Sequence, residues 1–399
     1  MNAPSTTAHF DTDVLIVGAG PTGLALATTL HRAGVSTLIV DKLETGQNTS
    51  RAAVIHAHTL EVLDTIGVSK NLAREGLRVT RFTLRDRDRK LAQLNFDELP
   101  SNYAHLLMLP QDATERILRE VLADASQRVR WGSSVESLSQ TAEGVEAVVQ
   151  SKAGRATLRA RYVVGADGMN SLVRRTAGIG FSGSNYEDSF VLADVDMEWG
   201  LSRDEVMLFF SPSGLLVVAP LPNGHFRLVA TVDNAHEKPG VADMQALLDA
   251  RGPAQGAGRI SSVTWSSRFR LQHRVADHYR AGRFLLVGDA AHVHSPAGGQ
   301  GMNTGLVDAV VLGKTLAEVI SGRRDAVFLD QYERLRRPAA VQVLGLAGRL
   351  TSMATLKNAL GRLIRNAVLK TITRLPMVRR RLQMDLSGLS RRAATVLPI

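Results

Sequence analysis

The stretch that decides the fold is residues 14–23, VLIVGAGPTG, close to the N-terminus. Its first four residues form a short apolar run, which is typical of a strand buried on both faces. Residues 22–33 follow with helical periodicity, and residues 37–40, TLIV, form a second apolar run. A strand, a crossover helix and a second strand predict a parallel pair with a right-handed connection. We therefore expect an α/β domain at this end of the chain.

Three glycines between the first strand and the helix have the spacing G-x-G-x-x-G. Gly18 permits a tight turn, Gly20 lets the backbone approach a pyrophosphate, and Gly23 allows the helix to pack closely on the strand. The free N–H groups and the dipole at the helix N-terminus favour phosphates. Asp41 ends the second strand, where a carboxylate accepts hydrogen bonds from ribose hydroxyls. The pattern predicts a dinucleotide site, but it does not distinguish NAD from FAD.

Two later regions narrow the choice of dinucleotide. Residues 162–171, YVVGADGMNS, lead from a strand through an Asp-Gly pair into a helix. Residues 282–292, GRFLLVGDAAH, lead from a strand into a Gly-Asp pair, and residues 295–303, SPAGGQGMN, follow as a glycine-rich loop. In these segments, from about Asp13 to Arg337, the chain resembles the class A flavoprotein monooxygenases of the para-hydroxybenzoate hydroxylase type. The resemblance implies that the cofactor is FAD.

The resemblance also implies a para-hydroxybenzoate hydroxylase-like α/β fold. In that fold a Rossmann-like FAD-binding domain carries an inserted antiparallel β-sheet substrate domain and a C-terminal helical segment. The β-rich runs between residues 188 and 232 agree with such an insert. The expected divisions are residues 1–77, 108–180 and 282–340 for the FAD-binding domain, residues 78–107 and 181–281 for the substrate-binding sheet, and residues 341–399 for the basic helical segment.

The cofactor contacts expected from the resemblance lie in and beside these motifs. Asp289 would hold the ribityl chain of FAD, and residues 299–303 would wrap the pyrimidine end of the flavin. A helix N-terminus at that end stabilises the negative charge of the reduced flavin. The full set of expected cofactor-binding residues is Gly18, Gly20, Gly23, Asp41, Lys42, Arg51, Gln111, Asp167, Gly168, Asp289, Pro296, Gly299, Gly301, Met302 and Asn303.

The substrate pocket is expected between the flavin and the β-sheet insert. Pro296, in the loop over the flavin ring, and His225, as a base for substrate deprotonation, are the catalytic candidates. A structural histidine is the alternative interpretation of His225. Alternation along strands should turn about half of any set of wall candidates away from the pocket. The candidates are Met207, Phe209, Phe210, His225, Phe226 and Trp265.

The resemblance implies an oxidoreductase, an aromatic hydroxylase, that takes electrons from NADPH or NADH. It further implies that O₂ adds to the reduced flavin and that the resulting hydroperoxyflavin transfers one oxygen atom to an aromatic or phenol-like small molecule. An epoxidase or reductase of the same fold acting on an isoprenoid or another alkene stays open, as does a non-catalytic FAD-binding protein. The chain departs from many members at residues 311–315, VLGKT, and at His58, where arginine is common. The substrate of any one branch is therefore not carried over.

The positive charge of the chain is concentrated at its C-terminal end. Residues 334–399 hold 14 Lys and Arg against one acid, Asp385, whereas the other residues hold 34 basic and 37 acidic side chains. Apolar residues recur at helical intervals between residues 341 and 369, which predicts a helix packed on the FAD domain. Peripheral contact with an anionic membrane and a homodimer contact are the alternatives. No nucleic-acid-binding motif accompanies the charge, so we expect no nucleic-acid partner.

Composition excludes several other classes of protein. The chain has no cysteine, which removes disulfides, thiolate metal sites and cysteine nucleophiles. Asp289, His292 and His294 resemble metal ligands, but the flavin motif accounts for all three, and we predict no metal site. Neither a secretory leader nor an apolar run of about 18 residues is evident, which favours a cytoplasmic protein.

Overall fold

The first strand, helix and second strand lie where the sequence predicts them. The protein is represented by a computed structural model that describes residues 9–46, 52–124, 128–232, 236–254, 258–295, 298–354, 356 and 358–398. In it, β1 spans Thr12–Val17, α1 spans Pro21–Arg32 and β2 spans Thr37–Val40. β1 and β2 pair in parallel, and the middle of β1 is fully buried. Burial on both faces explains why the run is continuously apolar rather than alternating.

These strands belong to a sheet with the order β17–β18–β11–β1–β2–β8. The C-terminal half of β11 pairs in parallel with β1 and β18. Its N-terminal half pairs antiparallel with β10, and β10 in turn pairs antiparallel with β9. The later strands of this sheet are β8 Val129–Arg130, β9 Ser134–Gln140, β10 Val145–Ser151, β11 Gly154–Gly165, β17 Arg280–Ala281 and β18 Phe284–Leu286. The sheet thus draws strands from both ends of the chain.

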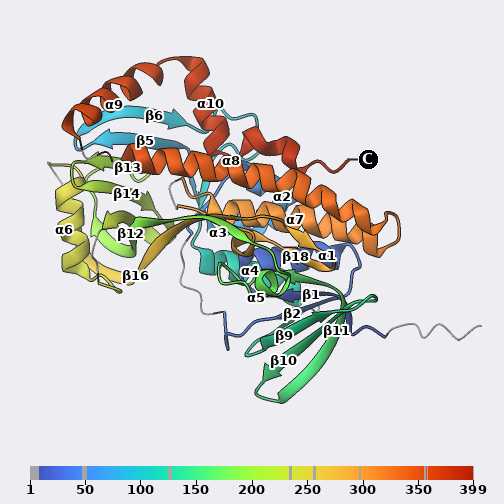
Figure 1. Ribbon diagram of the computed structural model, residues 1–399. Helices are drawn as coiled ribbons and strands as arrows, with labels where there is room; N and C mark the ends of the chain where they lie inside the picture. The colour runs from blue at the N-terminus through green and yellow to red at the C-terminus, as the bar shows by residue number, and fades with distance from the viewer. Residues whose placement is uncertain are drawn as a thin grey trace, which may run out of the picture.

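Helices enclose the parallel sheet. α7, which is almost entirely buried, contacts α1 and α2, and α1 also contacts α4 (Figure 1). The helices associated with this sheet are α2 Ala57–Asp64, α3 Ser69–Glu75, α4 Gln111–Asp124, α5 Leu172–Thr176 and α7 Gly301–Ile320, with short 3₁₀ turns η2 Gly288–Ala290 and η3 Ala326–Leu329. α7 begins immediately beside the carboxyl end of the sheet, where ligands bind in open α/β folds.

A second sheet has the order β19–β16–β12–β15–β14–β13–β5–β6. Its pairings are antiparallel except that between β13 and β5, which is parallel. The prediction of an antiparallel insert therefore holds for all but one pairing, because β5 and β6 come from an earlier excursion of the chain. The strands are β5 Arg81–Asp86, β6 Arg89–Asn95, β12 Phe181–Glu198, β13 Glu205–Ser211, β14 Gly214–Pro220, β15 Phe226–Val232, β16 Arg259–Ala276 and β19 His292–Val293.

Smaller elements complete this part of the molecule. α6 (Val241–Arg251) covers one face of the second sheet and contacts β13, β14 and β16 (Figure 1). A three-stranded sheet, ordered β3–β7–β4, is formed by strands that precede and follow β5 and β6 along the chain. Its strands are β3 Val54–Ile55, β4 Leu77–Val79 and β7 Leu106–Met108, and a short 3₁₀ turn, η1, spans Pro222–Gly224.

The C-terminal part is helical, as predicted, but its divisions differ from those expected. α8 (Asp330–Ala354) runs unbroken through residues 340 and 341, where a division was expected, and the domain bounds stay a prediction. The single helix predicted over residues 341–369 is wrong: α8 ends at Ala354, and α9 (Ala359–Ile372) packs on β6 rather than on the FAD domain. α10 (Pro376–Leu386) and η4 (Leu389–Thr395) follow (Figure 1).

α9 exposes an apolar face. Leu360, Leu363, Ile364 and Val368 are each between 46% and 66% exposed, and basic residues such as Lys370 lie on the same helix. The membrane-surface and homodimer alternatives stay predictions for this face. Among the described residues, no helix has the length and apolar content that crossing a membrane requires. The parallel sheet, the inserted sheet and the terminal helices together confirm the predicted fold class.

Candidate functional site

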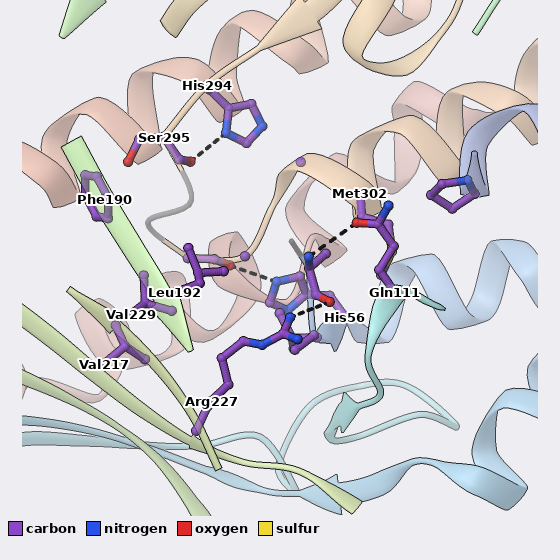
Figure 2. A pocket seen from close by; sticks show the side chains of 18 of the residues that line it. His56, Gln111, Phe190, Leu192, Val217, Arg227, Val229, His294, Ser295 and Met302 are labelled. Atoms are coloured by element: carbon purple, nitrogen blue, oxygen red, sulfur yellow. Dashed lines mark hydrogen bonds between the residues drawn. The ribbon is translucent and has the colours of Figure 1, made fainter. Parts of the chain in front are cut away.

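A cavity of about 470 Å³ lies where the glycine turn after β1, the start of α7 and one face of the second sheet meet. Figure 2 shows Val217, Val229, Leu192 and Phe190 along the sheet, with His56 and Met302 at the other end. The lining at the parallel-sheet end includes Gly20, Pro21, Thr22, Ala166, Gly168, Met169, Asp289, Gly298, Gly299, Gly301 and Met302. The lining from the second sheet includes Phe82, Phe190, Leu192, Val206, Leu208, Leu215, Val217, Ala219, Arg227, Val229, Phe269 and Gln272.

The three glycines of the first turn have three different surroundings. Gly18 has φ +106°, and a Cβ there would lie 2.3 Å from the carbonyl oxygen of Ala166. A Cβ on Gly23 would lie 2.0 Å from the carbonyl oxygen of Gly18, so only glycine allows α1 to pack this closely. By contrast, a Cβ on Gly20 would meet no described atom within 4 Å. Gly20 is therefore bare on the side that lines the cavity, as a close backbone approach to a phosphate requires.

The carboxylate of Asp41 is fixed at the end of β2. Its Oδ2 accepts a hydrogen bond from the N–H of Ala19 at 2.7 Å, and its Oδ1 accepts one from the N–H of Leu43 at 2.9 Å. An ionised carboxylate accepts about four hydrogen bonds, so acceptor capacity is left for ribose hydroxyls. Lys42, the next residue, is exposed and does not line the cavity.

The Asp-Gly pair stands across the turn from these glycines. Oδ2 of Asp167 accepts hydrogen bonds from the N–H groups of Leu172 and Val173, at 2.7 and 3.2 Å, and so caps α5. Its Oδ1 is buried without a hydrogen-bond partner in the described part of the chain. A ligand hydroxyl would satisfy such an acceptor. Gly168 lines the cavity directly.

The Gly-Asp pair and the start of α7 form the wall opposite. Asp289 is exposed towards the cavity, and Gly299, Gly301 and Met302 line it. Asn303 does not line the cavity. Its Oδ1 accepts a hydrogen bond from the N–H of His56 at 2.8 Å, and its Nδ2 donates to the carbonyls of Val54 and Gly299. The side chain of Asn303 thus holds β3 against α7, and the expected contact of residues 299–303 with the flavin, which involves backbone N–H groups, stays a prediction.

Two predicted residues lie outside the described part of the chain, and a third is firmly placed. Arg51 and Pro296 fall among the residues that are not described. Gln111, at the start of α4, lines the cavity. Its Oε1 accepts from the N–H of Ala52 at 3.3 Å and its Nε2 donates to Oε1 of Glu115 at 3.0 Å. Gln111 thus links α4 to the segment that leads into β3.

The six aromatic, methionine and histidine candidates for the sheet wall are all absent from the cavity lining. On β13 the residues that face the cavity are Val206 and Leu208, and Met207 and Phe209 pack against α6 instead. We predicted that the side chains of β13 alternate between two faces, but not which of them face the cavity. The largest side chains fill the space between the sheet and its covering helix instead. Phe226 packs there as well, and Phe210 belongs to the cluster that contains Leu369 of α9.

His225 lies away from the cavity. Its Nδ1 is 2.5 Å from Oδ1 of Asp196, and it borders a separate hollow together with Asp194 and Thr264. A histidine in this position reaches no atom in the main cavity. The alternative interpretation of a structural histidine fits this position, and we do not propose His225 as a base.

Sequence reasoning missed Arg227. Its guanidinium is almost fully buried at the cavity wall and donates from Nε and Nη2 to the two carboxylate oxygens of Asp194, both at 2.7 Å. Nη1 donates to the carbonyl of Ala52 at 2.8 Å, so one side chain connects the second sheet to the segment just before β3 (Figure 2). A single arginine in an otherwise largely apolar strand was the available signal, since a buried charge requires a partner.

Two histidines in the cavity wall were also missed. Burial lowers the pKa of His56 and that of His294 to about 4, so both rings are neutral near pH 7. Nε2 of His56 lies 2.9 Å from the carbonyl of Gly298, and Nδ1 of His294 lies 2.9 Å from that of Ser295. His292, which resembled a metal ligand in sequence together with Asp289 and His294, contacts Asp308 instead: its Nε2 lies 2.5 Å from Oδ2 of Asp308. Oδ1 of Asp308 also accepts a hydrogen bond from Arg336. This buried trio anchors the loop after the Gly-Asp pair to α7 and α8.

A family model described as "FAD binding domain" matches residues 11–347. The chain belongs to this family. The bare backbone at Gly20 and the helix N-terminus at Gly301 fit FAD, and the family match confirms the cofactor predicted from the sequence. Together with the monooxygenase relatives described next, this match confirms the resemblance to the class A flavoprotein monooxygenases.

Two curated members of this group are similar over most of the chain. It is 37% identical to 6-methylpretetramide 4-monooxygenase of Streptomyces rimosus over 354 residues, which cover 87% of this chain and 63% of that protein. It is 35% identical to pentachlorophenol 4-monooxygenase of Sphingobium chlorophenolicum, covering 86% and 65%. The chain thus spans a little under two thirds of the length of these relatives.

One solved structure has the same fold over nearly all of both compared chains. The p-nitrophenol 4-monooxygenase PnpA from Pseudomonas putida DLL-E4 superimposes with a TM-score of 0.86 at 24% identity, covering 96% of this chain and 99% of that one. At this identity the likeness concerns the fold alone.

Proposed function

We propose that the protein is an FAD-dependent monooxygenase that hydroxylates an aromatic or phenol-like small molecule with NADPH or NADH and O₂. The observation that carries the proposal is that one continuous cavity joins the glycine turn and the start of α7 to an apolar sheet face. A flavin ring held at the first end would lie beside a substrate held against the second. The names of the relatives, a pentachlorophenol and a 6-methylpretetramide monooxygenase, support an aromatic substrate.

FAD would extend across the carboxyl end of the parallel sheet. Gly20 and the N-terminus of α1 would hold the pyrophosphate, Asp41 the adenosine ribose and Asp289 the ribityl chain. Gly299, Gly301 and Met302 would lie along the pyrimidine edge of the flavin. At that edge the positive end of the α7 dipole favours negative charge on the ring.

The bound cofactor would supply hydride acceptance and O₂ activation. Overall, the substrate, NAD(P)H, a proton and O₂ give the hydroxylated product, NAD(P)⁺ and water, so each turnover inserts one oxygen atom and reduces the other. The chain contributes binding, orientation and the exclusion of water. Leu192, Leu208, Val217 and Val229 form the apolar floor that keeps the substrate side dry.

The charges in the cavity indicate which aromatic compounds it accepts. Among the described lining residues Asp289 is the single acid, and it lies at the FAD end. The substrate side carries Arg227, Gln272 and the neutral His294. Phe190 and Phe269 stack at 6.0 Å and present ring faces and edges to a planar ligand. Because the charge of Arg227 is paired with that of Asp194, a neutral phenol fits this side better than a cationic amine.

The test is turnover by the FAD-loaded protein with a panel of phenols and larger fused-ring phenols under ¹⁸O₂. We expect at least one compound to stimulate NADPH or NADH oxidation and to leave with one labelled oxygen atom. Product mass and NAD(P)H consumption are measured together, so that uncoupled peroxide release is separated from hydroxylation.

Free FAD with heat-denatured protein is the control for non-enzymatic oxidation. NAD(P)H consumption with reduced but unlabelled products would replace the proposal by a reductase of this fold. A protein that binds FAD yet never oxidises NAD(P)H faster with any compound would replace it by a non-catalytic FAD-binding role.

A further inference from the structure

The end of the chain contacts the turn that leads into α7. Leu386, the last residue of α10, lines the cavity, and its carbonyl accepts a hydrogen bond from Nε2 of Gln300 at 2.9 Å. Arg391 in η4 donates from Nη2 to Oε1 of Gln300 at 3.0 Å. Gln300 is only 2% exposed and stands immediately before α7. Both ends of its buried amide are thus held by the C-terminal segment.

The same amide continues to the cavity wall. Nε2 of Gln300 also lies 3.2 Å from the carbonyl oxygen of Gly298, to which Nε2 of His56 is 2.9 Å distant. Nδ1 of His56 has no partner in the described part of the chain, so we assign its proton to Nε2. Gly298 and His56 both line the cavity. A short hydrogen-bonded path therefore leads from Arg391 to the surface that faces the flavin's expected position.

Arg391 brings a positive charge to this path. Burial lowers its pKa to about 10, which leaves the guanidinium protonated at neutral pH. No ion pair joins it to a carboxylate of the described residues, and Asp385 acts on it only from a longer range. His56, on the cavity side, is neutral. The charge thus adds to the positive end of the α7 dipole without a contacting anion.

We propose that Arg391 is a positioning residue for the flavin, which fixes the turn at residues 298–300 through Gln300 and favours the reduced state of the ring by its charge. The idea rests on the proposed function only in that the ring takes a hydride, two electrons and one proton, from NAD(P)H, which leaves as NAD(P)⁺. The ring thereby changes from neutral to anionic. A fixed cation beside the turn before α7 stabilises the anion more than the neutral ring.

The experiment measures the midpoint potential of bound FAD by anaerobic dye titration in Arg391→Gln and Arg391→Lys. In Arg391→Gln we expect the affinity for reduced FAD to fall about tenfold more than that for oxidised FAD, which lowers the potential by about 30 mV. Arg391→Lys keeps the charge and should keep the potential close to that of the unaltered protein. Arg381→Gln is the matched control, because it removes one charge near Asp385 from a side chain that is 86% exposed.

The outcomes separate charge from packing. Equal potentials in the Lys and Gln variants, or a shift of the same size in Arg381→Gln, would overturn the role of the charge. If Arg391→Gln does not retain FAD, the Lys variant decides: an unchanged potential supports the proposal and a lowered one contradicts it. The midpoint potential is measured without substrate, so it tests the role of Arg391 even if no phenol is hydroxylated. A colourless protein would instead contradict FAD binding itself.

Discussion

The two ends of the cavity are built from different parts of the polypeptide. At the FAD end the surface is largely backbone, exposed where Gly20 has no side chain and where α7 begins. At the sheet end the surface consists of alternate side chains from neighbouring strands, such as Leu208 and Val217. The first surface depends on a local conformation that only certain residues allow, whereas the second depends on which face of a sheet a helix covers.

The largest expected effect separates two glycines of the FAD end. Gly20→Val places a side chain where the phosphate would approach, so FAD affinity should fall by at least about 100-fold. This corresponds to a loss of about 2.7 kcal/mol of binding free energy. The apoprotein should melt as before, because Gly20 has extended backbone and a Cβ there meets no described atom within 4 Å. Gly23→Ala should instead destabilise the apoprotein by about 3 kcal/mol through overpacking. FAD titration and urea unfolding of each apoprotein measure the two quantities.

Gly34→Ala serves as a further comparison, because its positive φ makes it a strained site away from the cavity. A loss of apoprotein stability in Gly20→Val equal to that in Gly23→Ala would show that Gly20 is a packing position and not a phosphate contact.

The next effect concerns the side chain that joins the two ends. Arg227→Met removes the partner of Asp194 and the hydrogen bond to Ala52, which should lower the free energy of unfolding by about 3–5 kcal/mol. The double variant Arg227→Met/Asp194→Leu should recover part of this loss, since no unpaired charge remains. Chemical denaturation of both variants gives the comparison. A double variant that is less stable than the single one would mean that the ion pair itself, rather than the orphaned carboxylate, dominates.

pH offers a third test, directed at the two neutral histidines of the wall. An unfolded chain takes up protons on His56 and His294 near pH 6.5, whereas the folded protein takes them up only near pH 4. Stability should therefore be constant above about pH 6.5 and fall between pH 6.5 and 4. The expected slope at pH 5 is about 1.4 kcal/mol per pH unit for each histidine.

The groups that face these rings come from several elements. The carbonyls of Gly298 and Ser295 favour protonation, whereas Arg391 opposes it at both sites, as do His292 and His273 at His294. Denaturation midpoints of His56→Gln and His294→Gln from pH 4.5 to 7.5 measure each contribution. If neither substitution flattens the profile, the acid loss belongs to other groups.

The difference between the two ends also explains what could be predicted from the sequence. Some features of the site are local in the sequence, because the positions of glycines indicate the backbone conformation of a turn. These are the strand, turn and helix at residues 12–32 and the later Asp-Gly and Gly-Asp turns. Arg227, His56 and the contacts of Gln300 with Leu386 and Arg391 join residues far apart in the chain, and no local pattern encodes them. The phase of β13 was not evident either, because both faces of that strand are apolar and buried.

The smallest effect tests that phase directly on two adjacent residues. Leu208→Phe adds volume on the cavity face, so we expect KM for a large fused-ring phenol to rise about tenfold, a change of about 1.4 kcal/mol, with little change for a single-ring phenol. Phe209→Leu alters the opposite face, where Trp199 packs against the ring at 6.4 Å, and should cost about 1 kcal/mol of stability while leaving both KM values unchanged. Steady-state kinetics and urea unfolding on the same preparations provide both readouts. Reversed results, with selectivity changed by Phe209→Leu and not by Leu208→Phe, would place the substrate on the α6 side of the sheet and break the contrast between the two faces.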